Sequence, residues 1–120
     1  MLCEVRDQHR ARWESFFHDY DVMLAPVAIC AAFPHMPDGN LYSRTLDIDG
    51  VQRPYADLIK WTAQFGYVGL PSTVVPVGFT PQGLPVGIQV VGPHLGDRTT
   101  LAFARHLEQL LGGYQPPPGF

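Results

Sequence analysis

Residues 72–92 read STVVPVGFTPQGLPVGIQVVG. Two runs rich in β-branched residues, at 72–79 and 86–92, flank the turn sequence Thr-Pro-Gln-Gly at 80–83. This pattern is typical of two antiparallel strands joined by a short connection. Pro76 has no backbone N–H to donate to a neighbouring strand, so we expect its strand to lie at an edge of a sheet or to contain a bulge.

Helical patterns flank this hairpin on both sides. After it, residues 97–111 space their apolar side chains three and four apart, and we expect Asp97 to cap the first turn of that helix. Before it, residues 55–67 and 2–19 show the same periodicity. In the segment 55–67, the side chains expected to point inward are Leu58, Ile59, Thr62 and Phe65.

Short strands are also expected nearer the N-terminus. Residues 21–25 are apolar at consecutive positions, which is typical of a strand buried on both faces. Residues 46–51 contain Asp49-Gly50, a tight-turn signal between two short strands. The order of elements predicts one α/β domain of mixed α+β layers over residues 1–120, with an extended Pro-rich tail at 115–120.

Composition argues against several classes of protein. Charged side chains make up 16% of the 120 residues, and the net charge is −3 with no basic patch, so neither nucleic acid nor a membrane surface is expected as a partner. The longest nearly apolar run, 22–33, is shorter than the ~20 residues of a bilayer-spanning helix. Cys3 and Cys30 form no disulfide framework, and the N-terminus lacks a secretory signal, so we expect a cytoplasmic location.

No catalytic constellation is complete in the sequence. The serines are Ser15, Ser43 and Ser72, and the last follows Gly-Leu-Pro rather than lying in the glycine-flanked elbow of a hydrolase nucleophile. A spatial triad of Ser72, His94 and Asp97 stays open at this point, because the members of a triad need not be close in sequence.

Metal sites are not indicated either. The five histidines show no pair at the spacing of helical metal ligands. Asp47-x-Asp49-Gly50 begins like a calcium loop, but it lacks the later acidic ligands and a hairpin turn explains it. We therefore predict no catalytic residue, no metal site and no cofactor in this chain.

Three segments together resemble one known family. Residues 21–26 (DVMLAP) resemble the Asp-Val-Leu-Leu-Thr-Pro strand of the amidase signature family. Residues 69–78 (GLPSTVVPVG) are similar to its Gly-Leu-Pro-Ala-x-x-Val-Pro-x-Gly motif, and residues 83–92 (GLPVGIQVVG) to its Gly-Leu-Pro-Val-Gly-Leu-Gln-Leu-Val-Gly motif. The resemblance implies the C-terminal part of an α/β/α sandwich with a mixed sheet.

The resemblance also implies an activity and a missing part. Members of the family hydrolyse carboxamide C–N bonds, giving an acid plus ammonia or an amine, with a serine nucleophile, a second serine in a cis peptide and a lysine. Those residues lie in a region upstream of everything present here, and the single lysine, Lys60, is at an unrelated position. We therefore expect an incomplete domain that is inactive alone. Its expected partners are an amide substrate in the full-length enzyme, and either the N-terminal catalytic part or further copies through exposed sheet edges.

The expected role of this segment is to wall the substrate pocket. The alternative for the whole chain is a stand-alone, non-catalytic binding or interaction module. For the individual residues, the alternative is that they cover the core. The side chains expected to line the pocket are Pro26, Val27, Phe33, His35, Trp61, Phe65 and Tyr67.

Overall fold

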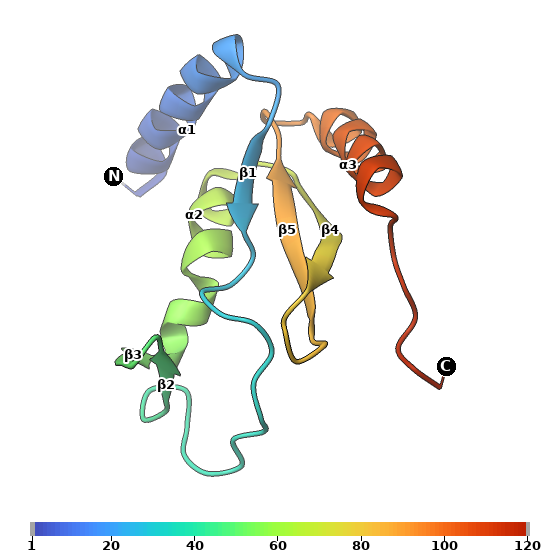
Figure 1. Cartoon of the computed structure of the whole chain (residues 1–120). Coiled ribbons are helices and arrows are strands. Elements are labelled where there is room, and N and C mark those ends of the chain that lie inside the picture. Colours follow the sequence, from blue (N-terminus) through green and yellow to red (C-terminus); the bar gives the residue numbers. More distant parts are fainter. Residues whose placement is uncertain (1, 120) are drawn as a thin grey trace.

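A computed structural model describes residues 2–119, and its centre is a three-stranded antiparallel sheet (Figure 1). The strand order is β1 (Met23–Pro26), β5 (Pro85–Val91) and β4 (Ser72–Phe79). Within β5, Val90 lies opposite Leu24 of β1 on one side and Thr73 of β4 on the other. The last strand in the sequence is therefore the middle of the sheet.

Residues 72–92 form the predicted hairpin, and both expectations for Pro76 are confirmed. β4 lies at an edge of the three-stranded sheet. Its register against β5 shifts between Pro76 and Gly78, which marks a β-bulge.

The backbone pattern explains why a proline is tolerated in β4. The N–H of Gly92 donates to the carbonyl of Pro71 at 3.0 Å. Because hydrogen-bonded and non-hydrogen-bonded pairs alternate in an antiparallel ladder, the backbone groups of Ser72, Val74 and Pro76 face the open edge. The N–H that Pro76 lacks is therefore not one that β5 requires.

Helices cover both faces of the sheet. α1 (Leu2–Asp19) and α2 (Lys60–Val68) pack on one face, and α3 (Asp97–Leu111) packs on the other (Figure 1). Because side chains alternate along a strand, adjacent residues of β5 enter different cores. Val91 packs with Phe65 of α2, whereas Val90 packs with Ala104 of α3. The chain thus has the expected mixed α/β class, arranged as helix, sheet and helix layers.

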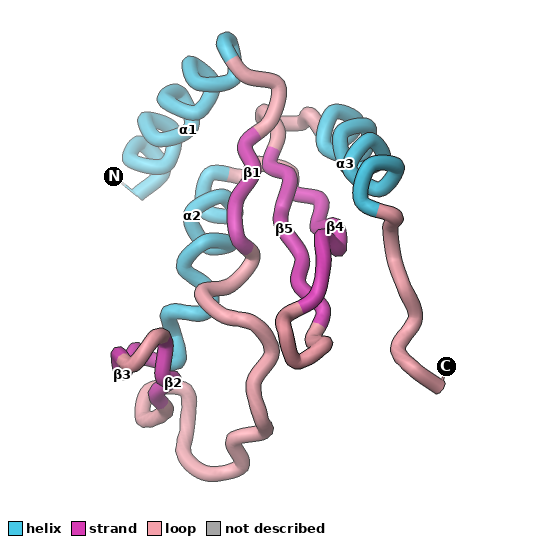
Figure 2. The backbone as a smooth tube through the Cα atoms, viewed as in Figure 1, coloured by secondary structure: helices cyan, strands magenta, loops and turns pink. Residues whose placement is uncertain are grey.

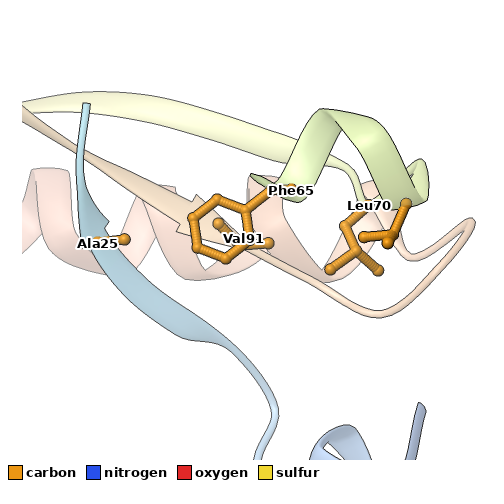
Figure 3. Packing of buried hydrophobic residues seen from close by; sticks show 5 residues of the cluster. Ala25, Phe65, Leu70 and Val91 are labelled. Carbon is orange, nitrogen blue, oxygen red and sulfur yellow. The ribbon is translucent and has the colours of Figure 1, made fainter. Parts of the chain in front are cut away.

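Phe65 is central to the core beneath α2. Its side chain is 1% exposed and lies against Val91, with Ala25 and Leu70 in the same cluster (Figure 3). The ring of Trp13 from α1 meets it edge-on, with ring centroids 5.4 Å apart. α1 is therefore fastened to the rest of the domain through aromatic packing.

A close contact docks the start of α3 on the sheet. The hydroxyl of Thr73 in β4 donates to the buried Thr100 hydroxyl at 2.8 Å, which in turn donates to the carbonyl of Asp97 at 2.9 Å. A Cβ at Gly92 would lie 2.6 Å from Cγ2 of Thr100. Only glycine therefore allows α3 to approach this closely.

A second, two-stranded hairpin precedes α2. β2 (Thr45–Ile48) pairs with β3 (Val51–Pro54), and the turn residues Asp49 and Gly50 have φ values of 54° and 81°, as the predicted Asp-Gly turn requires. A short 3₁₀ helix, η1 (Tyr55–Ile59), then leads into α2.

An ionic cluster ties β3 to the start of α2. Within it, the carboxylate of the buried Asp57 lies 2.9 Å from Arg53 Nη2 and 2.8 Å from Lys60 Nζ.

Three local predictions were wrong. β1 is not buried on both faces, because Leu24 is 44% exposed: α3 lies over β4 and β5 and leaves it open. Ile59 is 63% exposed because the 3₁₀ turn, with three residues per turn, rotates it away from the inward face of the α-helical pattern. Asp97 does not cap α3, because the N–H groups of Thr99 and Thr100 donate to the carbonyl of Gly96, which makes Gly96 the N-cap.

The C-terminal tail follows α3 without regular structure at residues 112–117 (Figure 1). The predicted tail extends to Phe120, which lies outside the described residues. Within residues 2–119, no helix is long and apolar enough to cross a bilayer.

Candidate functional site

The candidate site is built on the long loop between β1 and β2, residues 27–44 (Figure 2). Part of this loop encloses a cavity of about 350 Å³ together with the first residue of η1. The cavity is lined by Phe33, Pro34, His35, Met36, Pro37, Arg44 and Tyr55. Two of the predicted pocket residues, Phe33 and His35, therefore lie together at one hollow.

Tyr55 and Arg44 organise this hollow, and sequence analysis missed both. The ring of Tyr55 meets Phe33 edge-on at a centroid distance of 5.9 Å, and the Arg44 guanidinium carbon lies 5.7 Å from the Tyr55 centroid. Arg44 also donates from Nε to the carbonyl of Asp38 at 3.0 Å and from Nη2 to that of Gly39 at 3.1 Å. One arginine thus shapes the loop and stacks on the wall of the cavity. The sequence contained no periodic signal for it, because the contacts are made within irregular chain.

The other aromatic candidates lie elsewhere. Phe65 is in the core described above, and Trp61 packs against the same core. Tyr67 lies on α2 beside His9 of α1, with ring centroids 6.4 Å apart. The structure therefore does not bring these three side chains to the hollow at Phe33, and for Phe65 and Trp61 it shows the core packing that was the alternative interpretation.

Pro26 and Val27 mark the point where β1 becomes the loop. The carbonyl of Pro26 accepts a hydrogen bond of 2.7 Å from Nε2 of Gln89 in β5. Val27 is half-buried. Gln89 was not singled out from the sequence, although a carboxamide within an apolar strand is a signal that could have found it.

The open possibility of a triad at Ser72 is not supported by geometry. Oγ of Ser72 donates to Oε1 of Gln89 at 3.0 Å, and Nδ1 of His94 donates to the carbonyl of Gly69 at 2.9 Å. The hydroxyl and the imidazole thus have separate partners, and the ring nitrogen that would be oriented by Asp97 in a triad is bound to backbone. Lys60 is occupied by its ion pair with Asp57.

Two ionisable groups near the site have shifted pKa values. Hydrogen bonds from Lys60 and then Arg53 lower the pKa of the Asp57 carboxyl. Burial raises the pKa of the Cys30 thiol, in the loop. Within residues 2–119, no group of three or more His, Cys, Asp or Glu side chains is placed to hold a metal ion.

Comparison with known proteins places these features. The family model described as Amidase matches residues 1–101. The chain belongs to the amidase family. A glutamyl-tRNA(Gln) amidotransferase subunit from Halothermothrix orenii is 33% identical over 108 residues, covering 90% of this chain and 20% of the relative. Human fatty-acid amide hydrolase 2 is 45% identical over 60 residues, covering 50% of this chain and 11% of the relative.

A solved structure supports the fold of this amidase chain. The crystal structure of the corresponding glutamyl-tRNA(Gln) amidotransferase subunit from Thermotoga maritima superposes with a TM-score of 0.68 at 27% identity, covering 88% of this chain and 21% of that one. The chain thus spans about a fifth of the length of these two amidotransferase subunits. It is one portion of an amidase domain.

A larger groove of this amidase segment lies beside the open edge of β4. Its volume is about 760 Å³, and its walls are formed by β4, α3 and the residues that follow α3. Leu101 and Tyr114 contribute exposed apolar surface, and Arg98 and Arg105 contribute positive charge. The groove and the 27–44 loop are separate features.

Proposed function

We propose that this chain is the C-terminal segment of an amidase that hydrolyses carboxamide C–N bonds to an acid and ammonia or an amine. The segment supplies sheet strands and part of the substrate-pocket wall, and the catalytic residues come from the remaining part of the enzyme. The observation that carries this proposal is the family match over residues 1–101 by a chain that spans only about a fifth of its relatives.

The lining of the 27–44 loop suits a pocket wall. Loops are normally polar, because they run over the surface in water. Here Phe33 and Met36 are half-buried, and Phe33 packs on Tyr55 around a hollow that no other part of the described chain fills. We therefore include Pro26, Val27, Phe33 and His35 in the pocket wall. Trp61, Phe65 and Tyr67 support that wall from behind it.

The uncovered parts of the sheet suit a missing catalytic part. Leu24 and Val74 expose apolar surface on opposite faces of the sheet, and the backbone of β4 has an open edge. Open edges and apolar faces favour association with further chain. In the whole enzyme this surface contacts the catalytic part, in a cytoplasmic protein. In isolation it makes copies of the chain associate with one another.

An amidase assay on the purified chain tests the proposal. Benzamide and butyramide are incubated with the chain, with its Ser72→Ala variant and with buffer, and released ammonia is measured. We expect no release above buffer from either protein. Release by the wild type that Ser72→Ala abolishes would mean that the chain contains its own catalytic centre.

The gene distinguishes the remaining alternative. We expect an in-frame, serine- and glycine-rich coding region directly upstream of codon 1. Its product, mixed with this chain, should release ammonia from an amide that neither polypeptide hydrolyses alone. Absence of such a region would favour a stand-alone binding module.

A further inference from the structure

A buried carboxamide connects all three strands of the central sheet. Gln89 is 1% exposed and lies in the middle strand, β5. Its Nε2 donates to the carbonyl of Pro26 in β1 at 2.7 Å, and its Oε1 accepts from Oγ of Ser72 in β4 at 3.0 Å. Every other inward-facing residue of β5 is apolar or glycine. Gln89 is thus the polar exception in an apolar strand.

The carbonyl that Gln89 holds has a particular position. Pro26 is the last residue of β1, and the loop 27–44 leaves the sheet directly after it. Loss of a hydrogen-bond partner at a buried carbonyl costs more than the bond itself contributes, because the group is left without water or protein to satisfy it. The bond from Gln89 therefore selects one direction for the chain as it enters the loop.

We propose that Gln89 is a positioning residue for the 27–44 loop: its carboxamide fixes the exit from β1 and thereby sets the place of Phe33 and His35. The inference rests on the proposed function only for the meaning of that loop as a pocket wall. The contact itself concerns the described chain alone, and the test below detects loop order without any amidase activity.

Two cysteines provide a built-in probe. Cys30 lies in the loop, four residues after Pro26, where burial raises the pKa of its thiol. Cys3 is exposed on α1. Because the thiolate is the reactive form, the rate of modification at Cys30 reports how well the loop covers it. A Cys3→Ser background leaves Cys30 as the single thiol.

The experiment compares two variants in that background, each modified with 5,5′-dithiobis(2-nitrobenzoate) at fixed pH. Gln89→Met keeps the side-chain length but removes the donor to Pro26. Ser72→Ala is the matched control, because it removes the other hydrogen bond of the same carboxamide and leaves the bond to Pro26 in place. We expect Gln89→Met to raise the modification rate of Cys30 about tenfold. Ser72→Ala should leave the rate within about twofold of the background.

Urea unfolding of each variant separates local from global effects. A rise at Cys30 larger than the change in the global unfolding constant supports the positioning role. An unchanged rate in Gln89→Met, an equal rise in Ser72→Ala, or a rise fully explained by global unfolding would overturn it. If Gln89→Met does not fold, Gln89→Asn serves instead: its amide is one methylene too short to keep the 2.7 Å bond, and the same outcomes apply.

Discussion

At Gly92, one missing methyl group decides how closely α3 approaches the sheet. The position is filled from above by Thr100, whose side chain is itself fixed by hydrogen bonds to Thr73 and Asp97. Gly66, in the middle of α2, has open space around the position of a Cβ. The packing therefore requires a glycine at the first of these two positions and not at the second.

Substitution of these two glycines by alanine should therefore change stability in opposite directions. Gly92→Ala forces a methyl group to within 2.6 Å of Thr100 Cγ2 and should lower the free energy of unfolding by about 1–3 kcal/mol. Gly66→Ala should raise it by about 0.5–1 kcal/mol, because alanine loses less conformational freedom in a helix. Urea unfolding followed by tryptophan fluorescence measures both, and a Gly92→Ala protein as stable as the wild type would contradict the packing described for α3.

Residue-level prediction from sequence succeeded where the cause is local. The missing N–H of Pro76 and the positive φ of Gly50 are properties of those residues, and both predicted structures are present. Gln89 and Arg44 were missed because their roles depend on partners 63 and 6 residues away, which no local pattern reveals.

At the scale of elements, the junction between β3 and α2 depends on charge. Asp57 is buried between the end of the hairpin and the first turn of α2, and it is paired with Arg53 and Lys60. Hydrogen bonds from Lys60 and Arg53 lower the pKa of its carboxyl in the folded protein. The unfolded chain binds a proton more readily at this group, so the stabilisation is present above the ordinary value of 3.8 and is lost as the pH falls through the folded value.

Asp57→Asn should remove this pH-dependent contribution. We expect a lower urea midpoint than wild type at pH 7 and a smaller difference between the two proteins at pH 3, where the wild-type carboxyl begins to take up its proton. Asp49→Asn, at the exposed hairpin turn, is the control with the same change of charge and should leave the midpoint nearly unchanged. A difference between wild type and Asp57→Asn that is constant from pH 3 to pH 7 would contradict the ionic role.

Elements were predicted better than their ends and faces. The helices and strands were found because their apolar periodicity is written in the sequence, as in residues 97–111. The orientation of Ile59 and the capping of α3 were wrong, because a 3₁₀ turn and the turn at Pro93–Gly96 replace the geometry that the patterns assume. For the candidate site, the sequence indicated Phe33 and His35 correctly as neighbours of one hollow, whereas Trp61, Phe65 and Tyr67 are separated from it by the core.

At the scale of the whole molecule, the open surfaces predict self-association of the isolated chain. Val74 is 55% exposed beside the unpaired edge of β4. Sedimentation velocity over a range of concentrations should show a sedimentation coefficient that rises with concentration. Val74→Lys should reduce that rise, because a charged side chain at an edge strand opposes pairing.

Gln82→Lys is the matched control, since it adds the same charge in the turn between β4 and β5, away from the edge. It should associate like the wild type. A wild-type chain that stays monomeric at high concentration would contradict the idea that its sheet requires further protein.

The central place of β5 has a consequence for synthesis on the ribosome. β1 and β4 touch β5 but are not neighbours of each other in the sheet. A nascent chain that has emerged only as far as residue 84 holds both outer strands with nothing between them. The sheet, and with it the tether from Gln89 to Pro26, assembles only after about three quarters of the polypeptide has been translated, so the loop at 27–44 is among the first segments made and among the last to become ordered.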